Sequence, residues 1–347
     1  MPEQAPYAAE RIYGHSFPSN AGQTLRVNLK DHLADEILAE AFVRVVGDIV
    51  ITGAGPGAAT GRENPEGLIR NITARMKPDH GMSAMRDLTP RGQILASLFQ
   101  EQGFAIREAD VPDAAATVAV DFWIPLLYAK PTSVNAIEWG VPMGALDEYN
   151  LAITVGDRSD LFSGGVNSWD LSGLVVEVWV GTRKGFPGAK FHAVEQFEEI
   201  VPITASQSGF EHVLERGFIY SDLLVYSERD NVLVDGIVNK IRMNSGGREW
   251  FPGDSANVPY LKHLARRKLI TTSAESLVGL VPFPPFHDGR FTQMPNAGLK
   301  RIKLLLDVVR GSGDENVIIR GTRIKPFQLL HQPFAPKRSS KDRKSVV

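Results

Sequence analysis

Short stretches in which apolar and polar positions alternate recur along the whole chain. In residues 149–180, Leu151, Ile153 and Val155 occupy every second position, and the same spacing returns from residue 174 to residue 180. Because successive side chains of a strand point to opposite faces, this period of two predicts a pair of β-strands. Residues 156–173 between them are rich in glycine, serine, aspartate and asparagine, which is typical of a loop.

The remainder of the first half shows the same preference for strands. β-rich runs predict further strands at four places, namely residues 25–29, 43–52, 68–76 and 117–127. Apolar residues at three-to-four spacing predict a helix over residues 31–42. A second helix is expected after Thr89-Pro90, because proline is favoured at the first helical position.

The order of these elements in the first half returns in the second. Residues 48–52 resemble residues 222–226, and residues 67–72 resemble residues 236–241. The later matches are Pro90 with Pro259, Ile124-Pro125 with Val281-Pro282, residues 151–155 with 302–306, and residues 174–180 with 317–324. Each match is weak alone, but their common order favours an internal duplication.

Chain length and element order together predict the architecture. The 347 residues suit two units of about 170 residues each. Many short strands without regular strand–helix alternation favour antiparallel sheets, and this unit size suits a jelly roll of eight strands. We therefore expect an all-β chain of two tandem eight-stranded antiparallel jelly rolls with short helices in connections. The expected divisions are an N-terminal arm (1–21), a first jelly roll (22–182), a second jelly roll (183–330) and a basic C-terminal tail (331–347), with the joint in the glycine-rich residues 181–188.

Composition narrows the possible functions. The chain has no cysteine, which excludes disulfides, thiolate metal sites and a cysteine nucleophile. The formal net charge of -2 gives no overall attraction to nucleic acid or to an anionic membrane. Residues 1–20 lack the apolar segment of a secretion signal, and no run of eighteen apolar residues occurs, so we expect neither standard secretion nor a membrane span.

One glycine-rich segment resembles the nucleotide-binding turn of a flavin or nicotinamide enzyme. Gly53, Gly55 and Ala58 follow a β-rich run at the spacing of that motif. The motif needs a helix whose N-terminal amides face the pyrophosphate, and a new β-rich run at Leu68 leaves no room for it. The segment is interpreted as a loop, with a nucleotide enzyme kept as an alternative.

Other candidates for chemistry have plainer interpretations. The eight histidines are not at metal-ligand spacing, which favours isolated surface positions. Glu198 and Glu199 are neighbours on an expected strand, so they should point to opposite faces and be solvated. Ser245-Gly246-Gly247 is expected to form a turn. We therefore expect no catalytic residue, metal or cofactor, and no enzyme activity.

Tryptophans leave a second function open, that of a carbohydrate-binding or carbohydrate-active protein with two β-sandwiches. Aromatic rings can stack on sugars, and the candidates are Trp123, Trp139, Trp169, Trp179 and Trp250. Trp123 and Trp179 fall in expected strands, which favours packing, whereas the other three fall in segments that resemble loops.

The duplicated pattern resembles the double jelly-roll major capsid proteins of tailless icosahedral bacterial viruses that contain an internal membrane, or of a related prophage. Each half ends in a leucine-rich strand, a polar loop and a second alternating strand, and the stretches that carry the resemblance are residues 151–157 with 174–180 and residues 299–307 with 317–326. Ile124-Pro125 and Val281-Pro282, each ahead of the penultimate strand, fit the same family.

The resemblance implies a structural protein of the virion capsid, present in the host cytoplasm during assembly. It implies that three copies form a six-sided block that tiles an icosahedral shell, with itself and other virion proteins such as a vertex protein as partners and no specific nucleic-acid sequence. In the family the termini face the internal membrane. The basic residues that could then meet lipid headgroups are Lys337, Arg338, Lys341, Arg343 and Lys344.

Overall fold

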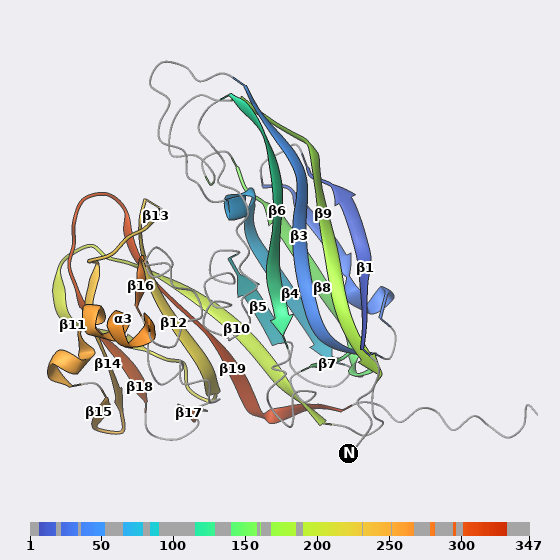
Figure 1. Cartoon of the computed structure of the whole chain (residues 1–347). Helices are drawn as coiled ribbons and strands as arrows, with labels where there is room; N and C mark the ends of the chain where they lie inside the picture. The colour runs from blue at the N-terminus through green and yellow to red at the C-terminus, as the bar shows by residue number, and fades with distance from the viewer. Residues whose placement is uncertain are drawn as a thin grey trace, which may run out of the picture.

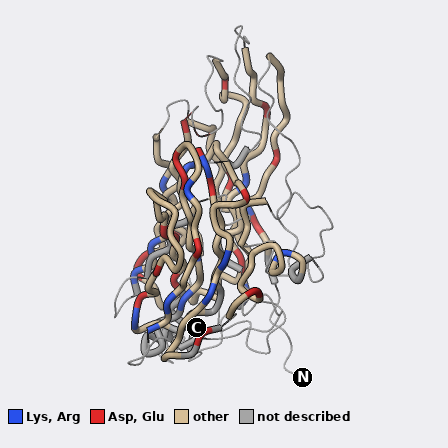
Figure 2. The backbone as a smooth tube through the Cα atoms, turned by 90° about the vertical axis from the view of Figure 1, so that its left-hand side faces the viewer, with Lys and Arg blue, Asp and Glu red and all other residues tan. Residues whose placement is uncertain are grey.

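The structure is a computed structural model, and two β-barrels lie side by side in it (Figure 1). Both signs of charge occur along the strands of the described chain (Figure 2). The structure describes residues 7–18, 22–33, 36–52, 65–78, 84–89, 115–128, 140–157, 160, 168–184, 190–230, 232–250, 252–266, 278–281, 294–295 and 301–331.

The first barrel consists of two facing sheets. One has the order β1-β9-β3-β6, with the short β7 (Val141–Pro142) also paired to β3, and the other contains β2, β8, β4 and β5 in adjacent positions. The strands are β1 (Tyr7–Ser16), β2 (Thr24–Asn28), β3 (Glu36–Thr52), β4 (Ile69–Pro78), β5 (Ala84–Leu88), β6 (Ala116–Tyr128), β8 (Leu146–Val155) and β9 (Ser168–Lys184).

The second barrel repeats this arrangement. One sheet contains β10, β19 and β12 with the short strands β13, β16 and β17 paired to β12, and the other has the order β11-β18-β14-β15. The strands are β10 (Lys190–Pro202), β11 (Gln207–Val213), β12 (Ile219–Arg229), β13 (Val232–Leu233), β14 (Val238–Ser245), β15 (Arg248–Trp250), β16 (Leu280–Val281), β17 (Met294–Pro295), β18 (Ile302–Val308) and β19 (Glu315–His331).

Strand order identifies each half as a jelly roll. The sheets of the first half have the strand orders β1-β9-β3-β6 and β2-β8-β4-β5, and these correspond to the orders β10-β19-β12-β16 and β11-β18-β14-β15 in the second half. Neighbouring strands within each barrel are antiparallel, as in two successive Greek keys. The predicted fold of two tandem antiparallel jelly rolls is confirmed.

A shared irregularity shows how closely the halves correspond. The β4–β8 ladder shifts register between Ile69 and Asn71, and the β14–β18 ladder shifts between Val238 and Lys240. The same backbone bond closes both ladders, since Gly156 N donates to Leu68 O and Val309 N to Ile237 O, each at 2.8 Å. The match of residues 67–72 with residues 236–241 therefore has the correct register, and both segments contain the same β-bulge.

Not every sequence match has the right register. Ile124 pairs with Val43 and Val281 pairs with Val225, which are equivalent positions, so that match holds. Residues 48–52 and 222–226 do lie in equivalent strands, β3 and β12, but they pair with different parts of β9 and β19. An alternating pattern looks the same after a shift of two residues, so it identifies the strand without fixing the pairing.

The two barrels are joined through a sheet edge. β10 runs parallel to β5, with Gln196 opposite Arg86, and this contact merges a sheet from each half into one 10-stranded sheet. The other edge of β10 pairs with β19, and the other edge of β5 pairs with β4. The second barrel thus begins beside the strand that completes the second sheet of the first.

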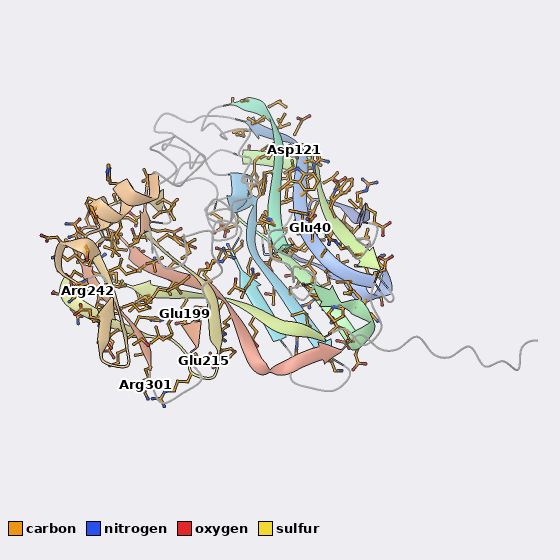
Figure 3. The ribbon with its side chains drawn as sticks, turned by 60° about the horizontal axis from the view of Figure 1, so that its bottom comes forward. Glu40, Asp121, Glu199, Glu215, Arg242 and Arg301 are labelled. Carbon is orange, nitrogen blue, oxygen red and sulfur yellow. The ribbon has the colours of Figure 1, made fainter. Side chains whose placement is uncertain are left out.

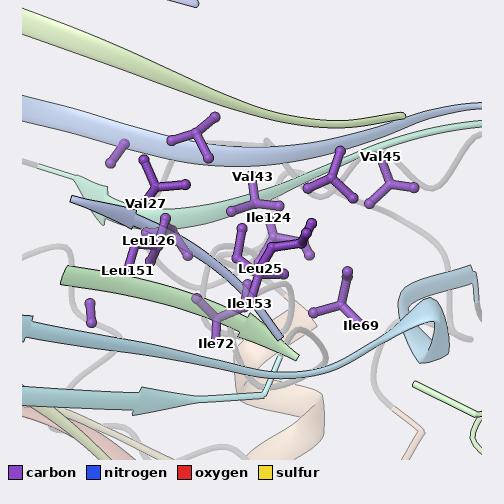
Figure 4. Close-up of a cluster of buried hydrophobic side chains, with 14 of the residues drawn as sticks. Leu25, Val27, Val43, Val45, Ile69, Ile72, Ile124, Leu126, Leu151 and Ile153 are labelled. Atoms are coloured by element: carbon purple, nitrogen blue, oxygen red, sulfur yellow. The ribbon is translucent and has the colours of Figure 1, made fainter. Parts of the chain in front are cut away.

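Each barrel encloses its own hydrophobic core. The first core takes buried residues from Phe17 to Val180, with Val43, Ile124 and Ile153 fully buried among them (Figure 4). The second core takes buried residues from Phe197 to Ile319. Burial of alternate apolar side chains from facing sheets is the main stabilising contribution in such a sandwich.

Two expectations for the first half differ from the structure. Residues 31–42 contain only the end of a short 3-10 helix (η1, Leu29–Asp31), and from Glu36 the chain forms β3. The three-to-four spacing there was coincidental, because the β-branched residues that follow extend one strand across the barrel. Residues 7–16 of the expected arm form β1, the edge strand of the first barrel.

Helices occur only in connections of the described chain. Besides η1, they are the 3-10 helices η2 (Pro65–Leu68), η4 (Met143–Ala145) and η5 (Gly253–Ala256), and the α-helix α3 (Val258–Arg266), which begins at a Val-Pro pair. The helix expected after Thr89 and the loop at 53–64 lie outside the described residues. Within the described part, no helix has the length and apolar character needed to cross a bilayer.

Candidate assembly surfaces

One face of the β1-β9-β3-β6 sheet packs on the first core, and the opposite face carries a cluster of large side chains. This sheet lies nearer the viewer than β4 and β8 in Figure 1, and its strands make their main described contacts with one another. Figure 3 shows Asp121 on this sheet. We call the group the outer cluster; it consists of Arg11, Phe42, Arg44, Asp121, Trp123, Glu177 and Trp179.

Arg44 is at the centre of the outer cluster. Its Nε and Nη2 donate to the two carboxylate oxygens of Asp121 at 2.8 and 2.5 Å, and its Nη1 donates to Glu177 at 3.3 Å. The hydrogen bond to Asp121 is the main cause that raises the pKa of Arg44 above its usual value. Bidentate hydrogen bonding to a carboxylate fixes the plane of the guanidinium group.

Glu177 joins the outer cluster across three strands. Only 7% of its side chain is exposed. It accepts hydrogen bonds from Arg11 Nη1 at 2.7 Å and from Trp179 Nε1 at 2.8 Å. Burial by itself would raise the pKa of Glu177, but hydrogen bonds from Trp179 and Arg11 and the charges of Arg11 and Arg44 leave that pKa lowered.

The aromatic rings of the outer cluster pack against one another in edge-to-face and tilted arrangements. Trp123 lies with its ring centroid 5.8 Å from that of Trp179 and 6.1 Å from that of Phe42, and Arg44 lies over the Trp123 ring at 5.0 Å. A cation over an indole face stabilises the group by about 0.5–1 kcal/mol at a partly exposed site. Arg44 therefore occupies one face of the Trp123 ring, which closes that face to a stacked sugar.

Replacing Glu177 by glutamine should lower the free energy of unfolding at pH 7 by about 1–3 kcal/mol, because two arginines lose their shared anion. The pKa of Glu177 is lowered in the folded state, so its contribution exists above its ordinary pKa and disappears as pH falls through the folded value. Urea unfolding at pH 7 and pH 3 measures this. An equal difference between wild type and variant at both pH values would contradict the assignment.

A surface groove lies at β1, the edge strand of the same sheet. It has a volume of about 480 Å³ and is lined by residues 11–16 of β1 together with Val175. β1 pairs with β9 on one side, and no other described strand pairs with its second edge. An unpaired strand edge is a ready template for association unless something covers it.

The corresponding face of the second barrel is buried. Glu198 of β10, Tyr226 of β12 and Arg320 of β19 project from the 10-stranded sheet on the side away from the second core, and we call them, with Thr89, the junction cluster. Thr89, the residue after β5, donates to Glu198 Oε1 at 2.8 Å, and Tyr226 donates to the same oxygen at 3.3 Å. Arg320 Nε lies 4.0 Å from Glu198 Oε2.

Burial controls the ionisation of the junction cluster. Desolvation raises the pKa of Glu198, opposed by the charge of Arg320 and by hydrogen bonds from Thr89 and Tyr226. Desolvation and then the charge of Glu198 raise the pKa of Tyr226. Solvation of both neighbouring acids was the wrong prediction, since Glu198 is buried against the first barrel. Glu199 does point to the opposite face, where its Oε2 lies 3.2 Å from His212 Nε2.

The other residues singled out in the sequence lie in several places. The five basic tail residues, Trp139 and the segment Gly53–Ala58 are outside the described residues. Trp169 lies in β9 against the first core and Trp250 ends β15, so neither is in a loop. Ser245-Gly246-Gly247 does form the β14–β15 turn, with both glycines at positive φ. In the described part, no cluster of three or more histidine, aspartate and glutamate residues could hold a metal.

Comparison with solved structures gives matches along nearly the whole chain. The major capsid protein (MCP) of STIV, the Sulfolobus turreted icosahedral virus, has a TM-score of 0.67 and 12% identity, over 93% of this chain and 98% of that chain. The major capsid protein of bacteriophage PM2 has a TM-score of 0.57 and 11% identity, over 92% and 97%. A PBCV-1 capsid chain has a TM-score of 0.57 and 10% identity, over 95% and 98%.

These matches establish the shared fold, and at such low identity they establish no more than the fold. No protein-family model and no curated protein sequence matches the chain. The expected resemblance to double jelly-roll capsid proteins is confirmed at the level of architecture.

Proposed function

We propose that this chain is a structural subunit of a viral capsid and not an enzyme. The observation that supports this most is the pair of jelly rolls in tandem, which matches the STIV and PM2 major capsid proteins over more than nine-tenths of all three chains. A shell subunit needs rigid contact surfaces, and two barrels joined by one continuous sheet supply them. The proposal extends to a tailless bacterial virus, for which the bacteriophage PM2 match is the support.

We further propose that three chains form a six-sided block. Each chain contributes two barrels of the same design, so three chains place six similar barrels around one axis. Light scattering on the purified chain should give three times the 38.1 kDa of one chain. Electron microscopy should show six-sided particles or shells. A monomer at every concentration and mild salt condition would overturn the proposal.

The basic tail is proposed to face an internal membrane. Lys337, Arg338, Lys341, Arg343 and Lys344 are the groups that would meet anionic headgroups, at about 1 kcal/mol for each residue near the surface. A vertex protein and neighbouring blocks are the other proposed partners, in a virion assembled in the host cytoplasm. These roles follow from the capsid proposal and fall with it.

A further inference from the structure

We infer that the outer cluster is covered by the β15–η5 segment of a second copy of this chain, so that copies join head to tail. The inference rests on the proposed capsid function and names the surface through which copies associate. It follows from comparing the two halves residue by residue, because one half already shows this surface in its covered state.

The two halves can be aligned through an equivalent backbone bond. Phe17 N donates to Leu174 O at the end of β1, and Ile203 N donates to Glu315 O at the end of β10. Five residues further along β9, Trp179 lies opposite Arg11. Five residues further along β19, Arg320 lies opposite Glu198, so Arg11 is equivalent to Glu198 and Trp179 to Arg320. The next strands agree, since Phe42 is opposite Trp179 and Leu224 is opposite Arg320.

Equivalent positions differ consistently in burial. In the second half, Leu224, Tyr226, Leu280 and Arg320 are all buried, with Arg320 only 3% exposed. In the first half, the equivalents of these residues are Phe42, Arg44, Trp123 and Trp179, and all four are only partly buried. The side chain of Arg11, equivalent to buried Glu198, is 55% exposed.

In the second half, the first barrel covers Glu198, the equivalent of Arg11. β5 lies beside β10, and Thr89 directly after β5 donates to Glu198. The equivalent of β5 in the second barrel is β15, because Ala74 pairs with Arg86 as Met243 pairs with Trp250. No described strand pairs with the second edge of β15, and η5 follows it.

The free strand edges β1 and β15 lie at opposite ends of the pair of barrels (Figure 1), and their surfaces complement each other. One end offers the edge of β1, its groove of about 480 Å³ and the exposed guanidinium of Arg11. The other end offers the edge of β15 and, in η5, the exposed carboxylate of Asp254. Placing β15 and η5 of one copy against β1 of the next repeats the contact inside each chain and brings Asp254 toward Arg11. Tryptophan and arginine, which make up much of the outer cluster, are enriched at the energetic centres of protein interfaces.

Site-specific cross-linking tests the inference, since the natural chain has no cysteine to interfere. Ala9→Cys on β1 and Asp254→Cys on η5 replace exposed residues. With a short bismaleimide, the double variant should give covalent dimers and closed trimers on a denaturing gel. Each single variant should give none, because a head-to-tail contact does not bring identical residues together. The matched control pairs Ala9→Cys with Val232→Cys, which is exposed on β13, and should also stay uncross-linked.

A charge reversal supplies a second readout. Asp254→Lys should weaken trimers about tenfold in a dilution series followed by light scattering, with the melting temperature of the separated chain unchanged. Trimers that neither cross-link through residues 9 and 254 nor weaken with Asp254→Lys would overturn the inference and leave the capsid proposal standing. A chain that is always monomeric would overturn both. Cross-linking of a single variant would show a two-fold contact and exclude the head-to-tail arrangement.

Discussion

Replacing Arg320 by methionine should lower the free energy of unfolding by about 3–5 kcal/mol at pH 7, the usual cost of removing one partner of a buried charge pair. Arg320 is only 3% exposed and lies beside Glu198, whose side chain is only 6% exposed. Without the cation, the carboxylate must either stay charged in a poorly solvated site or bind a proton. Guanidinium unfolding followed by tryptophan fluorescence measures the loss.

The pH dependence tests the cause of that loss. The folded pKa of Glu198 is already raised, so its favourable contribution is complete below its ordinary pKa and is lost as pH rises through the folded value. Removing Arg320 should raise that pKa further, and the difference between wild type and variant should grow from pH 4 to pH 7. Adding Glu198→Gln to Arg320→Met should restore much of the stability.

The matched control is Arg301→Met, at an exposed arginine outside the junction (Figure 3). It should change the free energy of unfolding by less than about 0.5 kcal/mol. If Arg320→Met costs no more than Arg301→Met, Arg320 and Glu198 do not act as a buried charge pair.

Replacing Gly47 by alanine should cost about 3–4 kcal/mol. Gly47 has a φ of +132°, and a Cβ atom there would lie 2.1 Å from the carbonyl oxygen of Gly173. The neighbouring atom is backbone, so β3 and β9 would have to separate where their ladder shifts register between Asp48 and Val50. Urea unfolding should show a lower midpoint with an unchanged slope.

Gly14→Ala is the control for the loss of glycine itself. Its Cβ would meet only the Arg11 side chain, at 3.9 Å or more, and its φ is not in the positive region. Alanine there should be neutral or slightly stabilising, because glycine in a strand costs backbone entropy. A Gly47→Ala variant as stable as Gly14→Ala would show that β3 and β9 can separate freely at this point.

The sequence predicted the fold well where local chemistry marks a position. Two sequence matches have the correct register, because a glycine or a proline marks a fixed position in each of them. They are Ile124-Pro125 with Val281-Pro282 and residues 67–72 with residues 236–241. Register failed in β3 and β12, which have 17 and 11 residues and few such marks. The matches of residues 151–155 with 302–306 and of residues 174–180 with 317–324 also start two residues out of register. Pairing there depends on contacts with β9 and β19, at separations of 86 to 148 residues along the chain.

The outer cluster and the junction cluster could not be predicted from the sequence for the same reason. Arg44 meets Asp121 and Glu177 at separations of 77 and 133 residues, and only the closed barrel brings them together. The sequence places Trp123 and Trp179 in strands, but alternation alone does not tell which face of the sheet they occupy. It predicts a solvated Glu198, because it does not show that β5 and Thr89 lie beside this residue.

The burial of the junction face also bears on the order in which the chain folds. Leu224, Tyr226 and Ile318 are buried on the junction face of the second barrel, whereas the equivalent face of the first barrel is only partly buried and carries paired arginines and carboxylates beside its aromatic rings. Synthesis delivers the first barrel before the second. The first barrel, whose outer face is already in contact with water, is therefore made first. It can then act as a template for the second barrel, whose equivalent face is buried, when that barrel emerges from the ribosome.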